Sequence, residues 1–459
     1  MKDIEIVKQG IEELLVRVRE ENQRLSDSLT DTVSLAEYSH LAKENDIWTD
    51  AFEAALAEHE VVVIPASDKP YRIDKPVIIP SNRKIIAEDG ANIRLARESR
   101  TQMMRNERTV DGTHYPIKDV TRAENITIIG GLWEHENESR GGYGKNCCYD
   151  ENNSIPGVSS VMFFENLDHL TLKNMTFKHS AGFSVQMGEI SNVIIQNIRF
   201  IKCFADGIHI NGNTQNVWIR DVEGHTGDDL VALNMYDWYN SSMNFGPAKN
   251  IICEDMAMSE DMGYKALRLL PGMYKFKDGS EVDCSLTNAI FRRISGVKTY
   301  KFYLQTPSYI VKNGIPYSGL GSADNIFFED ITVDLVSPID DLPDYINSDP
   351  VTGTFAAFEF GSNIGNLYFK NIDVKLYREK YPYSYIFCVG PKSVRMGERE
   401  IFNPYLSSEV ENVYLEDIKV NGVPVDDVKP YVREIEFDNL YDDGPSTGNG
   451  KIKNLHFKS

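Results

Sequence analysis

The hydrophobic positions follow two different periods along the chain. Between Asp3 and Leu25 apolar residues recur about every 3.6 positions, which predicts an amphipathic helix. A second helix is predicted from Trp48 to Glu60. From Val61 onward, short apolar runs are separated by Pro, Gly, Asn and Asp, a pattern typical of β-strands joined by turns. We therefore expect an N-terminal helical segment and cap over residues 1–60 and a β domain over residues 61–459.

A repeated pair of polar residues predicts how the strands of the β domain are arranged. An Asn, once an Asp, precedes an apolar strand at Asn125, Asp168, Asn192, Asn216, Asn250, Asn288, Asn325, Asn366, Asn412 and Asn454. A second polar residue follows most of these strands, at Asn174, Asn197, Asp221, Asp255, Asp330, Asn371 and Asp417. Two such marks at a fixed offset indicate coils whose turns stack, because one coil cannot bury its apolar face alone.

The fold class expected is therefore all-β, a right-handed parallel β-helix that follows a short N-terminal helical segment. In such a solenoid the repeated Asn side chains can hydrogen-bond to one another from coil to coil. The alternative is an antiparallel sandwich. A sandwich accounts for the turn residues but not for the paired marks.

Three aspartates are the strongest candidates for chemistry. When the coils are aligned by their marks, segments 181–187, 205–211, 227–234, 263–269 and 300–306 stack as the third strand of successive coils. Asp206 opens one of these strands, and Asp228 and Asp229 open the next. Because adjacent coils lie about 4.8 Å apart, the three carboxyl groups should crowd together, and at least one pKa should rise. That arrangement can divide acid and base roles between like groups; the alternative is that all three are turn residues at strand starts.

The aspartate segments resemble those of glycoside hydrolase family 28, the polygalacturonase group. The counterparts are Phe204-Ala205-Asp206-Gly207 and, one coil later, Gly227-Asp228-Asp229-Leu230. The resemblance implies a pectin-lyase-like solenoid, no cofactor, no metal, and hydrolysis of an oligosaccharide of galacturonide or a related sugar. It also implies an inverting mechanism in which Asp228 is the general acid. Asp206 and Asp229 would hold and deprotonate the attacking water.

The chain departs from the family at its cationic motifs. Gly263-Tyr264-Lys265 stands where the family has Gly-His-Gly, and Tyr303-Leu304-Gln305 stands where it has Arg-Ile-Lys. Alternatively, residues 266–270, which include Arg268, match the Arg-containing segment. We expect Lys265 and Arg268 to lie near the carboxylates, where they would lower a carboxylate pKa or hold an anionic sugar; the alternative is that both are surface charges.

Further substrate-binding residues are expected on the same face. These side chains are of the kinds that read sugar hydroxyls: Gln186, His209, Asn211, Asn234, Tyr303 and Gln305. His209 replaces an acidic residue common in the family, and a structural histidine is an equal alternative there. Six cysteines without CxxC spacing are expected to be buried thiols, and no metal-ligand spacing is visible.

Charge limits the partners and the surroundings. The chain has 69 acidic and 48 basic residues and a formal net charge of -21, which repels nucleic acid and anionic membranes. The first 19 residues lack the apolar region of a signal peptide, and no run reaches transmembrane length. We therefore expect a cytoplasmic protein whose partner is an oligosaccharide, with a homo-oligomer left open.

Two other classes of function stay open at this point. One is a different β-helix enzyme, such as a polysaccharide lyase, an epimerase or a fructan-type transglycosylase. The other is a non-catalytic carbohydrate-binding β-helix, which the departures from the family's cationic motifs keep open.

Overall fold

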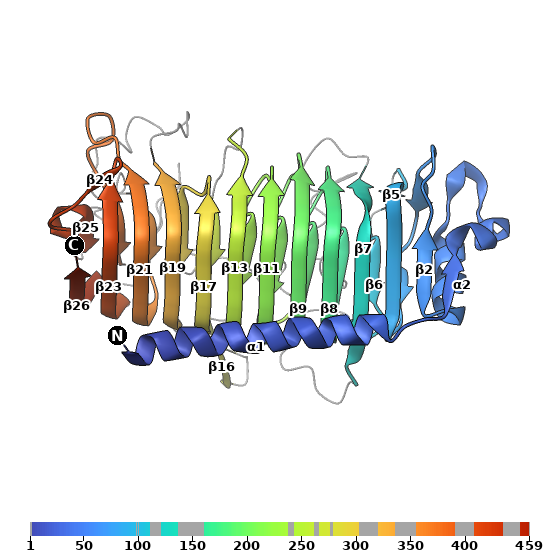
Figure 1. Cartoon of the computed structure of the whole chain (residues 1–459), viewed down its shortest axis with the longest axis horizontal. Coiled ribbons are helices and arrows are strands. Elements are labelled where there is room, and N and C mark those ends of the chain that lie inside the picture. Colours follow the sequence, from blue (N-terminus) through green and yellow to red (C-terminus); the bar gives the residue numbers. More distant parts are fainter. Residues whose placement is uncertain are drawn as a thin grey trace.

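The computed structural model describes residues 2–97, 99, 101–110, 121–135, 160–236, 243–260, 266–275, 279–302, 320–335, 355–390, 408–434 and 450–458. In these segments the chain winds into a right-handed parallel β-helix, and each coil pairs with the coils before and after it (Figure 1). The predicted fold class is confirmed.

Most coils contribute a long and a short strand. The long strands are β5 (Arg83–Leu95), β7 (Ala123–His135), β8 (Met162–Lys178), β9 (Val185–Ile201), β11 (Thr214–Gly224), β13 (Ala248–Met258), β17 (Leu286–Ser295), β19 (Ser322–Asp334), β21 (Asn363–Lys375), β23 (Ser408–Val420) and β26 (Gly450–Lys458). The short strands are β10 (Ile208–Asn211), β12 (Val231–Asn234), β14 (Ala266–Leu269), β18 (Thr299–Phe302), β20 (Phe355–Phe360), β22 (Ser384–Val389) and β25 (Val432–Glu434). The remaining strands are β1 (Thr32–Ser34), β2 (Val61–Ile64), β3 (Tyr71–Ile73), β4 (Val77–Ile79), β6 (Met104–Asn106), β15 (Gly272–Lys275), β16 (Glu281–Cys284) and β24 (Val423–Pro424).

The interior of the solenoid is apolar and contains rows of stacked rings. Phe328 stacks between Phe291 and Phe369, with ring centroids 5.2 and 5.0 Å apart. Four of the six cysteines lie in the described segments, and all four are buried and unbridged, as expected. Cys147 and Cys148 lie outside these segments.

The predicted column of asparagine side chains runs along the solenoid. The Nδ2 of Asn250 donates to the Oδ1 of Asn216 at 3.0 Å, and the Nδ2 of Asn288 donates to the Oδ1 of Asn250 at 3.1 Å. Asn250 has a φ of 57°, in the left-handed region that Asn tolerates better than most residues. The second marks also have positive φ, between 52° and 58°. Most marks, including all seven of the second set, therefore lie at a bend of the coil with positive φ, and the amide column links members of the first set.

Replacement of Asn250 should separate these two contributions. We expect Asn250→Ala to lower the free energy of unfolding by about 2–4 kcal/mol, because alanine tolerates positive φ less well than asparagine and the change removes two side-chain hydrogen bonds. Asn250→Gly should cost less, since glycine adopts this φ freely and only the hydrogen bonds are lost. Urea denaturation of both variants checks this, and an equal loss in both would remove backbone strain from the account.

The first helix lies along the side of the solenoid. Helix α1 (Lys2–Asp27) packs Ile11, Leu15 and Val18 against Trp218 and against the aliphatic residues in register with it on the neighbouring long strands. Figure 1 shows α1 crossing the long strands, with its N-terminal end beside the last coils. A helical turn rises about 5.4 Å and a coil about 4.8 Å, so successive turns meet successive coils. No helix in the described segments is long and apolar enough to span a bilayer.

The rest of the N-terminal segment covers the first coil. It contains η1 (Leu35–Leu41), η2 (Glu44–Asp46) and α2 (Thr49–Glu58), and α2 contacts β2 and β4. The two predicted helices therefore correspond to α1 and α2. Strand β1 precedes residue 61 and pairs with β2, so β structure begins earlier than the expected boundary. Residues 2–60 both cap the solenoid and brace its side.

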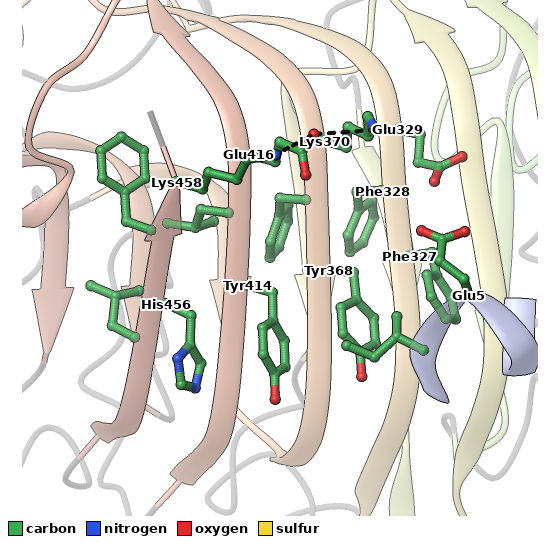
Figure 2. Close-up of a pocket in the computed structure, with 15 residues that line it drawn as sticks. Glu5, Phe327, Phe328, Glu329, Tyr368, Lys370, Tyr414, Glu416, His456 and Lys458 are labelled. Atoms are coloured by element: carbon green, nitrogen blue, oxygen red, sulfur yellow. Dashed lines mark ion pairs between the residues drawn. The ribbon is translucent and has the colours of Figure 1, made fainter. Parts of the chain in front are cut away.

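The row of residues on the long strands against which α1 packs continues past the N-terminal end of the helix. The ring centroid of Tyr368 lies 4.7 Å from that of Phe327 and 4.9 Å from that of Tyr414. Tyr414 stacks in turn on His456, with ring centroids 4.6 Å apart. Figure 2 shows this aromatic row beside a row of alternating charges, Glu329, Lys370, Glu416 and Lys458. Together with Ile4 and Glu5 of α1 they line a pocket of ≈ 520 Å³.

The brace should contribute measurably to stability. Leu15 of α1 is 0% exposed, and we expect Leu15→Ala to cost about 2–5 kcal/mol, the usual range for truncating a buried leucine. Ile6, on the same helix, is 66% exposed, so Ile6→Ala should change stability by less than about 0.5 kcal/mol. Thermal denaturation of the pair is the measurement. A loss at Leu15 no larger than that at Ile6 would mean that docking of α1 contributes little to stability, because both changes raise helix propensity.

Candidate active site

Two stacked turns carry the three aspartates to one place. Asp206 lies two residues before β10, and Asp228 and Asp229 precede β12 in the next coil. The amide of Gly207 donates to the carbonyl oxygen of Asp229 at 3.0 Å, and the amide of Asp229 donates to Oδ1 of Asp206 at 3.2 Å. The short strands pair in register behind the turns, with Ile208 opposite Val231.

Two glycines allow these turns to approach each other closely. A Cβ on Gly207 would lie 2.7 Å from the carbonyl oxygen of Leu230, and one on Gly227 would lie 2.5 Å from that of Phe204. Both distances are shorter than atoms can adopt without a shift of the backbone. The glycines of the two aspartate segments are therefore required by coil packing.

The three carboxyl groups crowd together, as the sequence predicts. One oxygen of each lies within 4.8 Å of one oxygen of the other two. Asp206 and Asp229 are buried, whereas the side chain of Asp228 is 16% exposed. Asp228 is therefore the carboxyl group of the three that solvent and a bound molecule reach most easily.

Asp206 is paired with a histidine. The Nδ1 of His209 lies 2.6 Å from Oδ2 of Asp206. Burial and the negative charge of Asp228 raise the pKa of Asp206, and the hydrogen bond from His209 opposes that rise. His209 is itself buried, and its ring stacks on Phe183 with centroids 3.8 Å apart. The sequence did not single out Phe183.

Of the three carboxyl groups, that of Asp229 has the surroundings least favourable to a negative charge. Burial raises the pKa of Asp229 well above its ordinary value, and the charges of Asp228 and Asp206 add to the rise. Arg268 and Lys301 oppose it. Within the described segments, neither carboxyl oxygen of Asp229 accepts a hydrogen bond, although the Nε of Arg268 lies 3.2 Å from Oδ2 as an ion-pair partner. Asp229 is therefore well suited to hold a proton.

Arg268 supplies positive charge at the cluster. Its Nη2 lies 3.3 Å from Oδ1 of Asp228, and its Nε lies 3.2 Å from Oδ2 of Asp229. Strand β14 positions it, because Arg268 stands opposite Ala232 of β12. The expected proximity of Arg268 to the carboxylates is confirmed, and the alternative of an unrelated surface charge is wrong for this residue.

Lys301 is a charged neighbour of Asp229 that the sequence analysis missed. Strands β14 and β18 pair Arg268 with Lys301, so both side chains lie on the same face. Alternation along β18 could have identified this lysine once the register was known. The register was uncertain because the additional strands β15 and β16 lie between β14 and the long strand β17.

Gln186, Asn211 and Asn234 stand behind the cluster. Each is buried, with 0–1% of its surface exposed. The Nδ2 of Asn211 donates to the carbonyl oxygen of Asn234 at 3.2 Å, and the Nε2 of Gln186 donates to the Oδ1 of Asn211 at 3.3 Å. Direct contact between these side chains and a sugar stays a prediction. Their burial favours a supporting role.

Three predicted binding residues, Lys265, Tyr303 and Gln305, lie outside the described segments. Their expected positions beside the carboxylates are therefore not tested.

Carboxylate oxygens in this arrangement are also the kind that Ca²⁺ prefers. Arg268 already lies beside two of the three carboxyl groups, and His209 bonds to the third. We therefore assign no metal to the site.

Comparison with known proteins shows the fold. No protein-family model and no curated protein sequence matches the chain. A family 28 exopolygalacturonase from Yersinia enterocolitica has a TM-score of 0.51 and 12% identity, covering 86% of this chain and 79% of its own. An exopolygalacturonase from Thermotoga maritima has a TM-score of 0.45 and 11% identity, covering 95% of this chain and 99% of its own. At such identities the likeness is one of architecture.

Proposed function

We propose that this protein is a glycoside hydrolase that cleaves oligosaccharides at the Asp206–Asp228–Asp229 cluster. The observation that carries the proposal is the placement of three carboxyl oxygens within 4.8 Å of one another, in environments of unequal burial. Glycoside hydrolysis requires one carboxyl group that donates a proton and another that is ionised. Unequal environments separate such roles. The shared architecture with a family 28 exopolygalacturonase supports the same reaction class.

The roles that we propose follow the family resemblance. Asp228, the most exposed of the three, would protonate the leaving oxygen, while Asp206 and Asp229 would hold the attacking water. The raised pKa of Asp229 makes Asp229 the second candidate for the proton donor. The two assignments can be distinguished, because replacement of the proton donor slows the reaction most for substrates with poor leaving groups. Rates of the Asp228 and Asp229 variants across a series of aryl glycosides measure this dependence.

The stereochemistry of the reaction is a separate question. Inverting enzymes usually hold their two carboxyl groups about 6.5–9.5 Å apart, and retaining enzymes about 5–5.5 Å apart. The oxygens here approach within 4.8 Å, so spacing alone does not favour inversion. We propose inversion on the resemblance, and proton NMR of the anomer first released decides it.

A substrate panel tests the function. The wild-type protein and the Asp206→Asn, Asp228→Asn and Asp229→Asn variants are incubated with aryl glycosides and with uronide oligomers, and new reducing ends are measured. We expect hydrolysis of at least one substrate by the wild type and loss in all three variants. Because the net charge is -21, weak activity on long polygalacturonate is expected. Sugar binding without turnover would favour a carbohydrate-binding protein instead.

A polysaccharide lyase is the second candidate. It would need Ca²⁺ on the carboxyl cluster in place of the Arg268 ion pairs, and a basic residue such as Lys265 to take the proton. A lyase releases an unsaturated product that absorbs ultraviolet light, and EDTA should abolish that activity. Reducing ends formed without this absorbance, and in the presence of EDTA, would exclude the lyase.

A further inference from the structure

A buried histidine connects one of the three aspartates to a hydrogen-bond network. His209 faces Asp206 through Nδ1 at 2.6 Å and the Nδ2 of Asn211 through Nε2 at 3.3 Å. His209, Asp206 and Asn211 are 0–2% exposed. A neutral imidazole carries one proton, and the position of that proton decides which ring nitrogen donates a hydrogen bond and which accepts one.

Two backbone groups determine the orientation of the Asn211 side chain. The amide of Met243 can only donate, and it lies 3.2 Å from the Oδ1 of Asn211. The carbonyl of Asn234 can only accept, and it lies 3.2 Å from the Nδ2. The oxygen and nitrogen of this side chain are therefore distinguished by their partners. Consequently the nitrogen, which has a second hydrogen to donate, is the atom that faces His209.

We infer that Met243, Asn234 and Asn211 hold neutral His209 in the tautomer protonated at Nδ1, and that His209 thereby keeps Asp206 as the ionised carboxylate of the site. Because Nε2 faces a donor, it must accept, and the ring proton lies on Nδ1 toward Asp206. The part of this inference that concerns catalysis rests on the proposed function. His209 is a positioning residue, since it acts through Asp206.

The charges around Asp206 explain why such a donor is needed. Asp228 and Asp229 lie beside it, and Arg268 faces those two residues. Burial and Asp228 favour protonation of Asp206, and the His209 bond favours the ionised form. A protonated Asp206 could not accept a proton from water. Loss of the His209 hydrogen bond should therefore favour protonated Asp206 and prevent it from acting as the base.

Nitrogen NMR on the wild-type protein labelled with ¹⁵N-histidine tests the tautomer without any need for activity. The His209 resonances are identified by their absence in His209→Phe. We expect a neutral ring protonated at Nδ1 at pH 7. A ring protonated at Nε2, or an imidazolium, would overturn the inference even if the protein proves to be a hydrolase. The expected spectrum would stand even if the protein proves not to be one.

The pH dependence of kcat/KM tests the consequence. His209→Phe keeps a flat ring against Phe183 but removes the donor, so we expect a 10- to 100-fold loss of kcat/KM and an acidic limb displaced to higher pH. His209→Gln retains an N–H donor and should restore part of the wild-type limb. His456→Phe is the matched control, because His456 also stacks on an aromatic ring, Tyr414, but on the long strands. An unchanged limb in folded His209→Phe would refute the role; if that variant does not fold, the Gln variant and the NMR measurement decide.

Discussion

Asp228→Asn should reduce turnover by two to four orders of magnitude, the usual loss when a general acid is removed. The carboxamide has nearly the same shape but cannot deliver a proton to the leaving oxygen. The loss should be large for substrates with poor leaving groups and small for activated aryl glycosides, whose leaving groups need no proton. Initial rates across a series of aryl glycosides measure this dependence.

The same variant should leave stability nearly unchanged. It removes the repulsion of Asp228 by Asp206 and Asp229, but it also removes the ion pair with Arg268 at 3.3 Å. These effects have opposite signs, and the site is partly exposed to solvent, so we expect little change in Tm. Retention of more than about a tenth of the activity on a poor leaving group would remove Asp228 from the acid role and transfer it to Asp229.

Asp229→Asn should inactivate the protein by at least two orders of magnitude and yet stabilise it. Burial holds the pKa of Asp229 well above its unfolded value of 3.8, so the folded state binds a proton that the unfolded state has lost. Ionisation of this group therefore weakens folding as pH rises from about 4. Each unit by which the pKa is raised corresponds to about 1.4 kcal/mol. Asparagine cannot ionise, so the gain should be largest above the folded pKa and vanish below about pH 4.

Urea denaturation at pH 4 and pH 8 checks this prediction. Asp89→Asn is the control, because Asp89 is exposed on β5 and its replacement should give no such difference. A gain that is the same at both pH values, or a loss at pH 8, would show that Asp229 is already ionised and compensated in the folded protein.

The repeated polar marks were sufficient to predict the architecture from one sequence. Positive φ at a bend is costly for most side chains, and Asn and Asp tolerate it best. Several of the same Asn positions also form the partly buried amide column, exemplified by Asn216, Asn250 and Asn288. Two physical requirements therefore coincide at many of the first marks, and the pattern remains visible although loops of different length separate the coils.

The crowding of Asp206, Asp228 and Asp229 could be predicted for a related reason. These residues open adjacent third strands, and the uniform spacing of coils brings any such pair of positions together. Glycine beside each segment adds to the signal, because only glycine permits this approach of the turns. The local sequence thus determined which side chains meet.

Tertiary structure alone decided which charged residues surround the cluster, how deeply the site residues are buried, and where the first helix lies. Register after a long insertion placed Lys301 in line with Arg268, and insertions of uneven length leave no periodic trace in sequence. Whether Gln186 and Asn211 face a sugar or one another depends on what covers them, and burial is a property of the assembled coils. The amphipathic pattern of α1 required an apolar partner surface but could not specify the row of residues containing Trp218 and Phe327, because that row exists only once the coils have stacked.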